Sequence, residues 1–327
     1  MRPVLRLFIG VTIAILILPT IIVGSWERVA STPDKQQPEI TVRLYVSSNK
    51  QLLNIGLEEY VKGVLAAEMP AKFHLEALRA QAVAARTYAV KRASVFGGKG
   101  CNSHPQADLC DDPAHCQAWL PAAELQKQWG MLEYQSNWSK ICQAVESTAG
   151  EIITYQGVAI DPLFHSTCGG KTEDAGAVWQ QSLPYLVSVE CPYCKHSPKL
   201  KTEQRYSLTA FASAIQALDG SIAVTAQSLR ATPPNFSIAK KTATGRADTV
   251  SIAGKTLQAT TLRYTLGLNS TRFTHQVEGD QIVFAVQGYG HGVGLCQYGA
   301  DGMGEAGFDY RAILQFYYRG TQVTNIR

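Results

Sequence analysis

The sequence lacks a concentrated stripe of basic residues, internal repeats and low-complexity tracts. Its formal net charge of +4 is small for 327 residues, whereas proteins that bind nucleic acid gather lysine and arginine on one face. We therefore expect no nucleic-acid partner. The glycine-rich segment 288–294 lacks the Gly-x-Gly-x-x-Gly spacing of dinucleotide sites, and we expect no organic cofactor.

Charge is also missing from the segment Leu7–Gly24, which follows Arg2 and Arg6. Such a segment is about the shortest that spans a bilayer as a helix. Positive charge ahead of it predicts that the N-terminus stays in the cytoplasm and the rest is exported. We predict a membrane anchor at 1–25 and a polar linker at 26–39. A cleaved signal peptide is the alternative, although no small-x-small cleavage site follows.

The hydrophobic pattern beyond the linker mixes helical and strand periods, which predicts an α+β fold. We expect a catalytic domain of helices and short strands at 40–204, an inserted smaller α+β subdomain at 205–275, and a closing part of the catalytic domain at 276–327. Helices are predicted at 57–67, 75–95, 121–150, 208–218 and 309–318. Strands are predicted at 40–46, 51–55, 151–155, 158–164, 236–239, 249–252 and 255–258.

Glu68 follows the apolar run Val64–Ala67 and precedes Met69 and Pro70. The proline ends the helix, so Glu68 lies at a helix C-terminus, where the helix dipole disfavours negative charge. Apolar surroundings also raise the pKa of a carboxyl group. Both effects favour a protonated carboxyl that acts as a general acid. An exposed carboxylate at a helix end is the alternative from the pattern alone.

Four segments resemble, in the correct order, the signature of the stage II sporulation protein D family. They are Glu58–Pro70 with Leu75–Tyr88, the His-Ser-Thr-Cys-Gly-Gly segment at 164–173, the glycine-rich segment at 288–300, and the closing segment at 310–320. The resemblance covers about residues 40–327. It implies a lytic transglycosylase that cleaves the bond between N-acetylmuramic acid and N-acetylglucosamine in peptidoglycan and leaves a 1,6-anhydro-muramic acid end.

The resemblance places the catalytic glutamate of the family on Glu68. One carboxyl group is enough for this reaction, because the C6 hydroxyl of the sugar attacks in place of water, whereas ordinary glycosidases use two carboxylates. The resemblance further implies engulfment during sporulation as the setting, with an amidase and other membrane proteins as partners.

Other polar and aromatic residues in these segments are candidates for binding the glycan strand. The resemblance suggests that Arg86 holds carbonyl or carboxylate groups of the substrate. For the histidines, hydrogen bonds to neighbouring backbone are an equal alternative, and for the tyrosines a place in the core. The remaining candidates are His165, Ser166, Thr167, Lys171, Glu173, Tyr289, His291 and Tyr298.

Within the loop 97–118, the thirteen residues 104–116 hold four histidines and cysteines, the types that bind zinc in tetrahedral sites. They are His104, Cys110, His115 and Cys116, and they resemble a stretch that binds zinc in some members of the family. We expect a structural zinc ion here. A disulfide between Cys110 and Cys116 with free histidines is the alternative.

The chain has eight cysteines, an even number that suggests disulfides outside the cytoplasm. Cys191 and Cys194 lack clear partners for a zinc site, so a local disulfide, or a bond to Cys101 or Cys142, is expected. Two further cysteines, Cys168 and Cys296, stand where the family pattern has serine. A disulfide between them is one interpretation.

Two rival functions remain open at this point. The first is a non-catalytic module that binds the wall and activates an amidase, as proteins described as amidase enhancers do. The second is a Cys-His peptidase, for which no oxyanion motif accompanies the cysteines.

Overall fold

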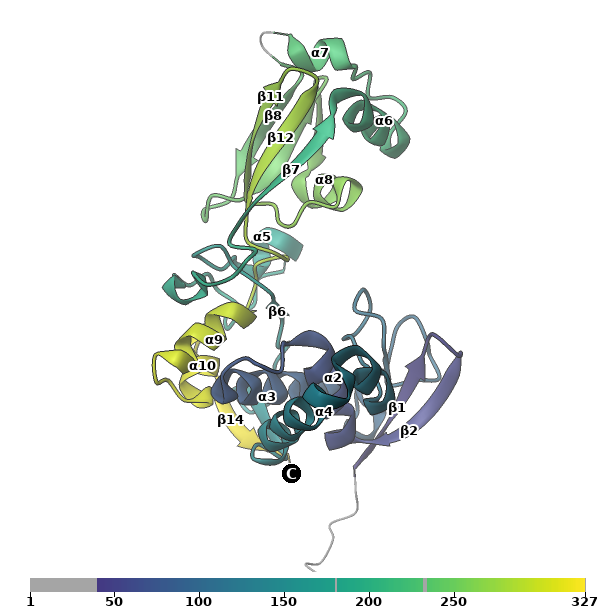
Figure 1. The fold of residues 1–327 in the computed structure, drawn as a ribbon, viewed down its shortest axis with the longest axis vertical. Coiled ribbons are helices and arrows are strands. Elements are labelled where there is room, and N and C mark those ends of the chain that lie inside the picture. The colour runs from purple at the N-terminus through teal and green to yellow at the C-terminus, as the bar shows by residue number, and fades with distance from the viewer. Residues whose placement is uncertain (1–39, 180, 232–233, 327) are drawn as a thin grey trace, which may run out of the picture. The chain divides into compact units, whose positions relative to one another are not determined.

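The computed structural model describes residues 40–179, 181–231 and 234–326. The predicted anchor at 1–25 and linker at 26–39 lie outside these residues. No helix within the described ranges is long and apolar enough to cross a membrane. The described chain combines helices with several small sheets (Figure 1), which confirms a mixed α+β fold.

A pair of helices forms the centre of the first region. Helix α2 runs over Leu57–Glu68 and α3 over Leu75–Arg92, close to the predicted ranges. Pro70 lies in the turn between them. α3 is buried around most of its circumference because its alanines let neighbours approach closely. The helices that pack against it are α2, α4 (Ala122–Glu146), α9 (Gln297–Glu305) and α10 (Tyr310–Tyr317).

Three small sheets surround these helices. The first joins β2 (Gln51–Gly56), β1 (Thr41–Val46) and β3 (Leu109–Cys110), with β1 and β2 antiparallel as predicted. The second joins β14 (Gln322–Asn325), β4 (Glu151–Tyr155) and β5 (Val158–Ala159). The third is a parallel pair of β6 (Phe164–His165) and β13 (Leu295–Cys296). Short elements η1 (Ser94–Phe96), α5 (Ala175–Trp179) and η2 (Pro192–Cys194) lie between them.

The second region has a hydrophobic core of its own, built from residues between Leu208 and Val286. One sheet has the order β11 (Phe273–Glu278), β12 (Gln281–Gln287) and β7 (Lys201–Ser207), and the other has β10 (Lys255–Gln258), β9 (Ala247–Ile252) and β8 (Phe236–Lys241). The helices are α6 (Leu208–Leu218), α7 (Ala226–Arg230) and α8 (Ala259–Leu266). The expected border at 275 falls inside β11. Strand β12 pairs with both β11 and β7, so the sheet of this subdomain continues beyond residue 275.

Two local predictions differ from the structure. The helix expected at 121–150 is interrupted at Gly130, whose φ of 72° is not helical. The single strand expected at 158–164 is divided into β5 and β6, with Pro162 between them. Proline has no N–H to offer a neighbouring strand, which explains the break.

Candidate active site

Glu68 is the last residue of α2, and its side chain is partly buried. The Ala118 amide donates a hydrogen bond of 2.8 Å to its Oε1. Its main-chain carbonyl accepts a bond of 3.1 Å from Nε2 of Gln297. The carboxyl group is therefore held from one side and its backbone from another, by segments far apart in the sequence.

Burial raises the pKa of the Glu68 carboxyl above its usual value, and the hydrogen bond from Ala118 opposes this rise. No basic residue lies in the last turn of α2 to stabilise a charge there. A carboxyl with a raised pKa keeps its proton closer to neutral pH, as a general acid requires. The prediction that the environment of Glu68 raises its pKa is confirmed.

The segment that holds the carboxyl group is fixed on α2 by close packing. Trp119 follows Ala118 and lies where a side chain on Gly63 would stand, since a Cβ there would come within 2.6 Å of the indole ring carbon Cδ1. The Leu120 amide donates to the Gly63 carbonyl at 3.4 Å. Only glycine leaves room for this approach, so Gly63 places the Ala118 amide against Glu68.

The predicted zinc ligands are only partly brought together. The sulfur atoms of Cys110 and Cys116 lie within 4.8 Å of each other and of Cys101, and we call these three cysteines the loop group. His104 stacks on Tyr45 at 3.8 Å between ring centroids. Nδ1 of His115 lies 3.2 Å from a carboxylate oxygen of Asp112. Neither histidine belongs to the group in this structure, and Cys101 was not among the predicted ligands.

The two glycine-containing segments lie side by side. β6 and β13 pair in parallel, and the backbones of Thr167 and Tyr289 exchange two hydrogen bonds. The Tyr298 amide donates to the Ser166 carbonyl at 3.1 Å. The segments 164–173 and 288–300 therefore form one unit beside the end of α2.

Arg86 does not face a substrate in this structure. Its side chain is completely buried and forms an ion pair with Glu58. It also donates to the main-chain carbonyls of Glu151 and Val145. Glu58 therefore joins α2 to α3 through this arginine. The sequence shows a charge on a helix, but not which neighbour covers it.

Several other candidates are also held by the protein itself. Glu173 is buried and accepts hydrogen bonds from the hydroxyls of Thr242 and Thr244. His165 is buried, with Nδ1 bonded to the Val293 carbonyl at 3.1 Å, and burial lowers its pKa. Thr167 is buried against Ser197 at 2.6 Å between their hydroxyl oxygens. These three residues shape the segment from inside.

The remaining candidates are at least partly accessible. Tyr289 is 43% exposed, and Lys171 forms an ion pair of 2.8 Å with Glu190. The ring of Tyr298 packs edge-on against Phe73, in the turn that follows Glu68, at 4.8 Å between centroids. The ring of His291 contacts the exposed Trp179 at 5.1 Å. Ser166 is partly buried.

Some residues that shape this site carry no recognisable sequence pattern. Nη2 of Arg246 donates to the Cys168 carbonyl at 2.8 Å, and Nη1 of Arg272 donates to the Gly169 carbonyl at 3.1 Å. Both arginines come from the inserted subdomain, so that subdomain holds the turn 168–170. Gln297 and the Ala118 amide were also missed, because their contacts with Glu68 form only when distant segments pack together.

The other cysteines are arranged differently from the expectation. Cys168, Cys191, Cys194 and Cys296 have sulfur atoms within 4.8 Å of one another, and we call them the core group. All four are free thiols here. The expectation that Cys191 and Cys194 lack partners is therefore wrong, and their neighbours are neither Cys101 nor Cys142.

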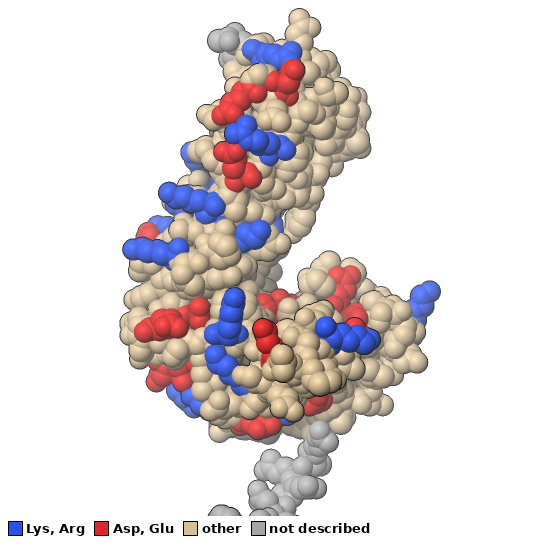
Figure 2. Space-filling model, viewed as in Figure 1, with Lys and Arg blue, Asp and Glu red and all other residues tan. Residues whose placement is uncertain are grey.

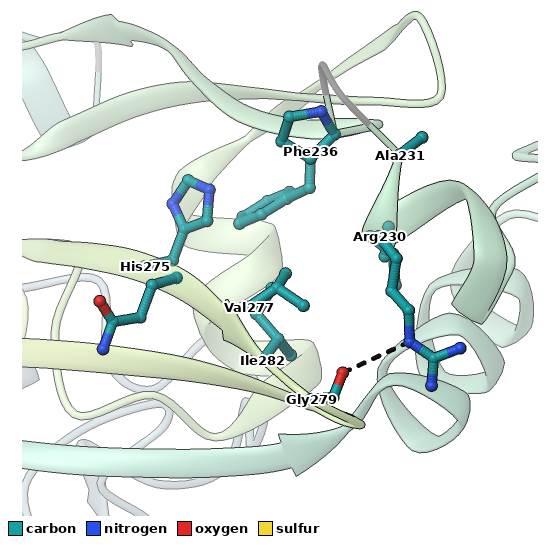
Figure 3. Close-up of a pocket in the computed structure, with 10 residues that line it drawn as sticks. Arg230, Ala231, Phe236, His275, Val277, Gly279 and Ile282 are labelled. Atoms are coloured by element: carbon teal, nitrogen blue, oxygen red, sulfur yellow. Dashed lines mark hydrogen bonds between the residues drawn. The ribbon is translucent and has the colours of Figure 1, made fainter.

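The rest of the surface adds little to the site. On the face shown in Figure 2, lysine and arginine side chains lie among aspartate and glutamate side chains. A cavity of about 460 Å³ lies in the inserted subdomain, between β11 and the end of α7. Figure 3 shows His275 beside Phe236 there, with Arg230 bonded to the Gly279 carbonyl. None of its lining residues is a predicted site residue.

Comparison with known proteins places this geometry in a family. A family model described as Stage II sporulation protein matches residues 45–155, which include Glu68 and the loop group. Stage II sporulation protein D of Bacillus subtilis (strain 168) is 40% identical over 87% of this chain and 79% of its own length. The protein of the same name from Bacillus amyloliquefaciens is 34% identical over 99% of this chain and 96% of its own length. A protein named amidase enhancer, from Bacillus subtilis (strain 168), is 28% identical over 81% of this chain and 40% of its own length.

Proposed function

The chain belongs to the stage II sporulation protein D family, and on that premise we propose that it is a lytic transglycosylase that cleaves the glycan strands of peptidoglycan. The observation that carries the proposal is the partly buried Glu68 carboxyl, whose pKa is raised by burial. Among the described residues, no other carboxylate forms a hydrogen bond with the Glu68 carboxyl group. Glu173, the glutamate among the predicted substrate-binding residues, is engaged by two threonines.

Glu68 acts first as an acid and then as a base in this reaction. Its proton passes to the glycosidic oxygen as the bond from C1 of N-acetylmuramic acid breaks. The C6 hydroxyl of the same sugar forms the new bond to C1, and its proton returns to the Glu68 carboxylate. No water is consumed, and the carboxyl group ends as it began. Proton transfer of this kind contributes about 10²–10⁴-fold to a rate.

Two contacts support this cycle. The Ala118 amide bonds to Oε1 and leaves the other oxygen free to carry the proton. Gln297 fixes the backbone of Glu68 and so limits the movement of the side chain. The exposed rings of Tyr289 and Trp179 offer flat faces to sugar rings near the same segments.

The test is cleavage of glycan strands without stem peptides by the full chain and by Glu68→Gln. We expect the wild type to release fragments ending in 1,6-anhydro-muramic acid, detected by mass spectrometry, and the variant to lose at least about 100-fold in rate. Glu59→Gln, an exposed glutamate on the same helix, is the matched control. Full activity of Glu68→Gln would overturn the acid assignment.

We also propose a zinc ion in the loop 101–118, with Cys110 and Cys116 among its ligands. Three thiols gathered within 4.8 Å suit a thiophilic ion. A bound zinc ion would supply a fixed loop geometry, because Ala118, whose amide bonds to Glu68, lies two residues after Cys116. The zinc content of the Cys101→Ser and His115→Asn variants shows which of these two residues is a further ligand. Zinc content equal in Cys110→Ser and wild-type protein would contradict the site.

The second candidate function is a wall-binding activator of an amidase. Similarity to a protein named amidase enhancer favours it, as does the engagement of Arg86 and Glu173 inside the protein. If the purified chain binds glycan strands and stimulates an amidase, yet wild type and Glu68→Gln both release no anhydro product, this function replaces the first.

The cellular setting is part of the proposal. We place the catalytic region outside the cytoplasm, tethered by residues 1–25, and acting during engulfment together with a sporulation amidase and other membrane proteins. Protease added to intact sporulating cells should digest the region 40–327. Protection of that region would contradict this orientation.

A further inference from the structure

The core group brings together cysteines from three separate parts of the chain. Cys168 follows β6, Cys191 and Cys194 flank the short η2 turn, and Cys296 ends β13 and caps α9. All four side chains are fully buried. Their sulfur atoms lie within 4.8 Å of one another, which is close enough for a single ion to contact all of them.

We propose that the core group binds one zinc ion through four thiolates, in a structural site distinct from the loop 101–118. Zinc–sulfur bonds of about 2.3 Å in a tetrahedron place the sulfur atoms roughly 3.8 Å apart. The Cys168 and Cys194 sulfur atoms are 3.5 Å apart. Two cysteines separated by two residues, as in Cys191-Pro-Tyr-Cys194, form the usual half of such a site.

The same geometry disfavours disulfides between these residues. A disulfide requires about 2.05 Å between sulfur atoms, and no pair of the four is bonded. Every sulfur has three sulfur neighbours instead of one preferred partner. That arrangement is what a common ligand in the middle requires.

Hydrogen-bond donors surround the sulfur atoms in a way that suits thiolates. The amides of Cys168 and Gly299 point at the sulfur of Cys296, at 3.2 and 3.3 Å, and the Gly170 amide points at the sulfur of Cys168 at 3.4 Å. The buried hydroxyl of Tyr317 lies 3.1 Å from the sulfur of Cys191. Such donors stabilise the negative charge of metal-bound sulfur and orient the ligands.

Two further features close the site. A Cβ on Gly299 would lie 2.7 Å from the sulfur of Cys191, so only glycine lets α9 approach the group this closely. Arg246 is buried with two guanidinium nitrogens unpartnered, and its third nitrogen bonds to the main chain of Cys168. A buried cation beside the site offsets part of the negative charge of four thiolates.

The site has a consequence for Glu68, although its existence does not depend on the proposed activity. Cys296 is followed by Gln297, which bonds to the Glu68 backbone. An ion that fixes Cys296 to η2 therefore fixes Gln297 too. The two cysteines that replace serine in the family pattern, Cys168 and Cys296, are the two that complete the Cys191–Cys194 pair.

The test is the zinc content of the full chain, purified without chelators and measured by mass spectrometry of the metal. The double variant Cys168→Ser/Cys296→Ser should lose one zinc ion per chain relative to the wild type. Cys142→Ser, a cysteine outside both groups, is the matched control and should lose none. Cys110→Ser should keep the core-group ion, so this result stands whether or not the loop 101–118 binds zinc.

A second measurement tests the site even if the double variant fails to fold. Cobalt loaded into Cys110→Ser protein should give the intense visible and thiolate charge-transfer absorption of a tetrahedral cobalt tetrathiolate. Modification of four thiols should release one zinc ion from the same protein. Equal zinc in the double variant and the control, or unreduced peptides joined by disulfides among the four cysteines, would overturn the proposal.

Discussion

Two hydrogen bonds hold Glu68, and each comes from a residue that follows one of the two cysteine groups in the sequence. The loop group lies within residues 101–116, just before the Ala118 amide that bonds to the Glu68 carboxyl. The core group joins residues 168 to 296 and lies next to Gln297, which bonds to the Glu68 backbone. One region therefore lies next to the Glu68 carboxyl group, and the other next to the Glu68 backbone.

The two cysteine groups differ in how far apart along the chain their members lie. Closing a short loop restricts the unfolded chain less than joining segments more than a hundred residues apart. We therefore expect the core group to matter more for stability and the loop group more for activity. Three predictions test this difference and a fourth supplies a reference, and they are given in order of decreasing effect.

The largest effect should come from removing one thiol of the core group. Cys191→Ser should lower the free energy of unfolding by about 3–5 kcal/mol, the range for losing a crosslink that closes a long loop. Cys110→Ser should cost less stability but more activity per folded molecule. Denaturant unfolding and glycan cleavage measure the two quantities, with Cys142→Ser as control. Equal losses of stability and of activity in Cys191→Ser and Cys110→Ser would contradict the expected difference between the two groups.

The ion pair between α2 and α3 gives a reference that is independent of both groups. Glu58→Gln leaves Arg86 buried without a carboxylate, and should cost about 3 kcal/mol of stability. Glu59→Gln removes only an exposed partner of Lys62 and should cost less than about 1 kcal/mol. Glycan binding per folded molecule should be equal in both. Weaker glycan binding by fully folded Glu58→Gln protein would indicate that Arg86 takes part in substrate binding.

The third prediction concerns Glu68, which bonds to the segment after the loop group, and the dependence of stability on pH. The folded state raises the pKa of Glu68, so it binds the proton more tightly than the unfolded chain, whose glutamate pKa is about 4.3. That stabilisation is complete below this value and is lost as the pH rises through the raised pKa. Glu68→Gln should match the wild type at acidic pH.

At neutral pH the same variant should be more stable than the wild type by about 1.4 kcal/mol for each unit by which the pKa of Glu68 is raised. Thermal unfolding across the pH range measures this difference, and Glu59→Gln should show none. Activity should fall as Glu68 loses its proton, so its alkaline limb should lie above the usual range for glutamate. A Glu68→Gln variant less stable than wild type at neutral pH would contradict the raised pKa.

The smallest effect should come from the side of the core group. Gln297→Leu removes one hydrogen bond to the Glu68 carbonyl and should cost about 1 kcal/mol. Activity should fall a few-fold through kcat, since the substitution loosens the support of Glu68 without touching its carboxyl. Gln315→Leu, an exposed glutamine on α10, is the control. An unchanged kcat would show that Gln297 does not position Glu68.

Much of the fold was predictable because its signals are local. The apolar period and Pro70 define α2 and α3 to within a few residues. The apolar run before Glu68 correctly predicted a raised pKa. The Gly130 break in α4 was missed because a glycine inside a helical pattern does not by itself show its backbone angles.

The substrate candidates were harder to predict, because a charged side chain is equally suited to a ligand or to a buried partner. Arg86 pairs with Glu58, and Glu173 accepts from Thr242 and Thr244. Those partners come from other helices or from the inserted subdomain. Their distance along the chain leaves no periodic signal.

The helix pair and the end of α2 near Glu68 follow from local sequence patterns. The contact between the two glycine-containing segments and the grouping of the cysteines are visible only in the folded chain. Folding placed Cys101 with Cys110 and Cys116, and it gave Cys191 and Cys194 the partners Cys168 and Cys296. Spacing along the chain fixes local contacts, but sulfur atoms from distant segments are brought together only by packing of the whole core.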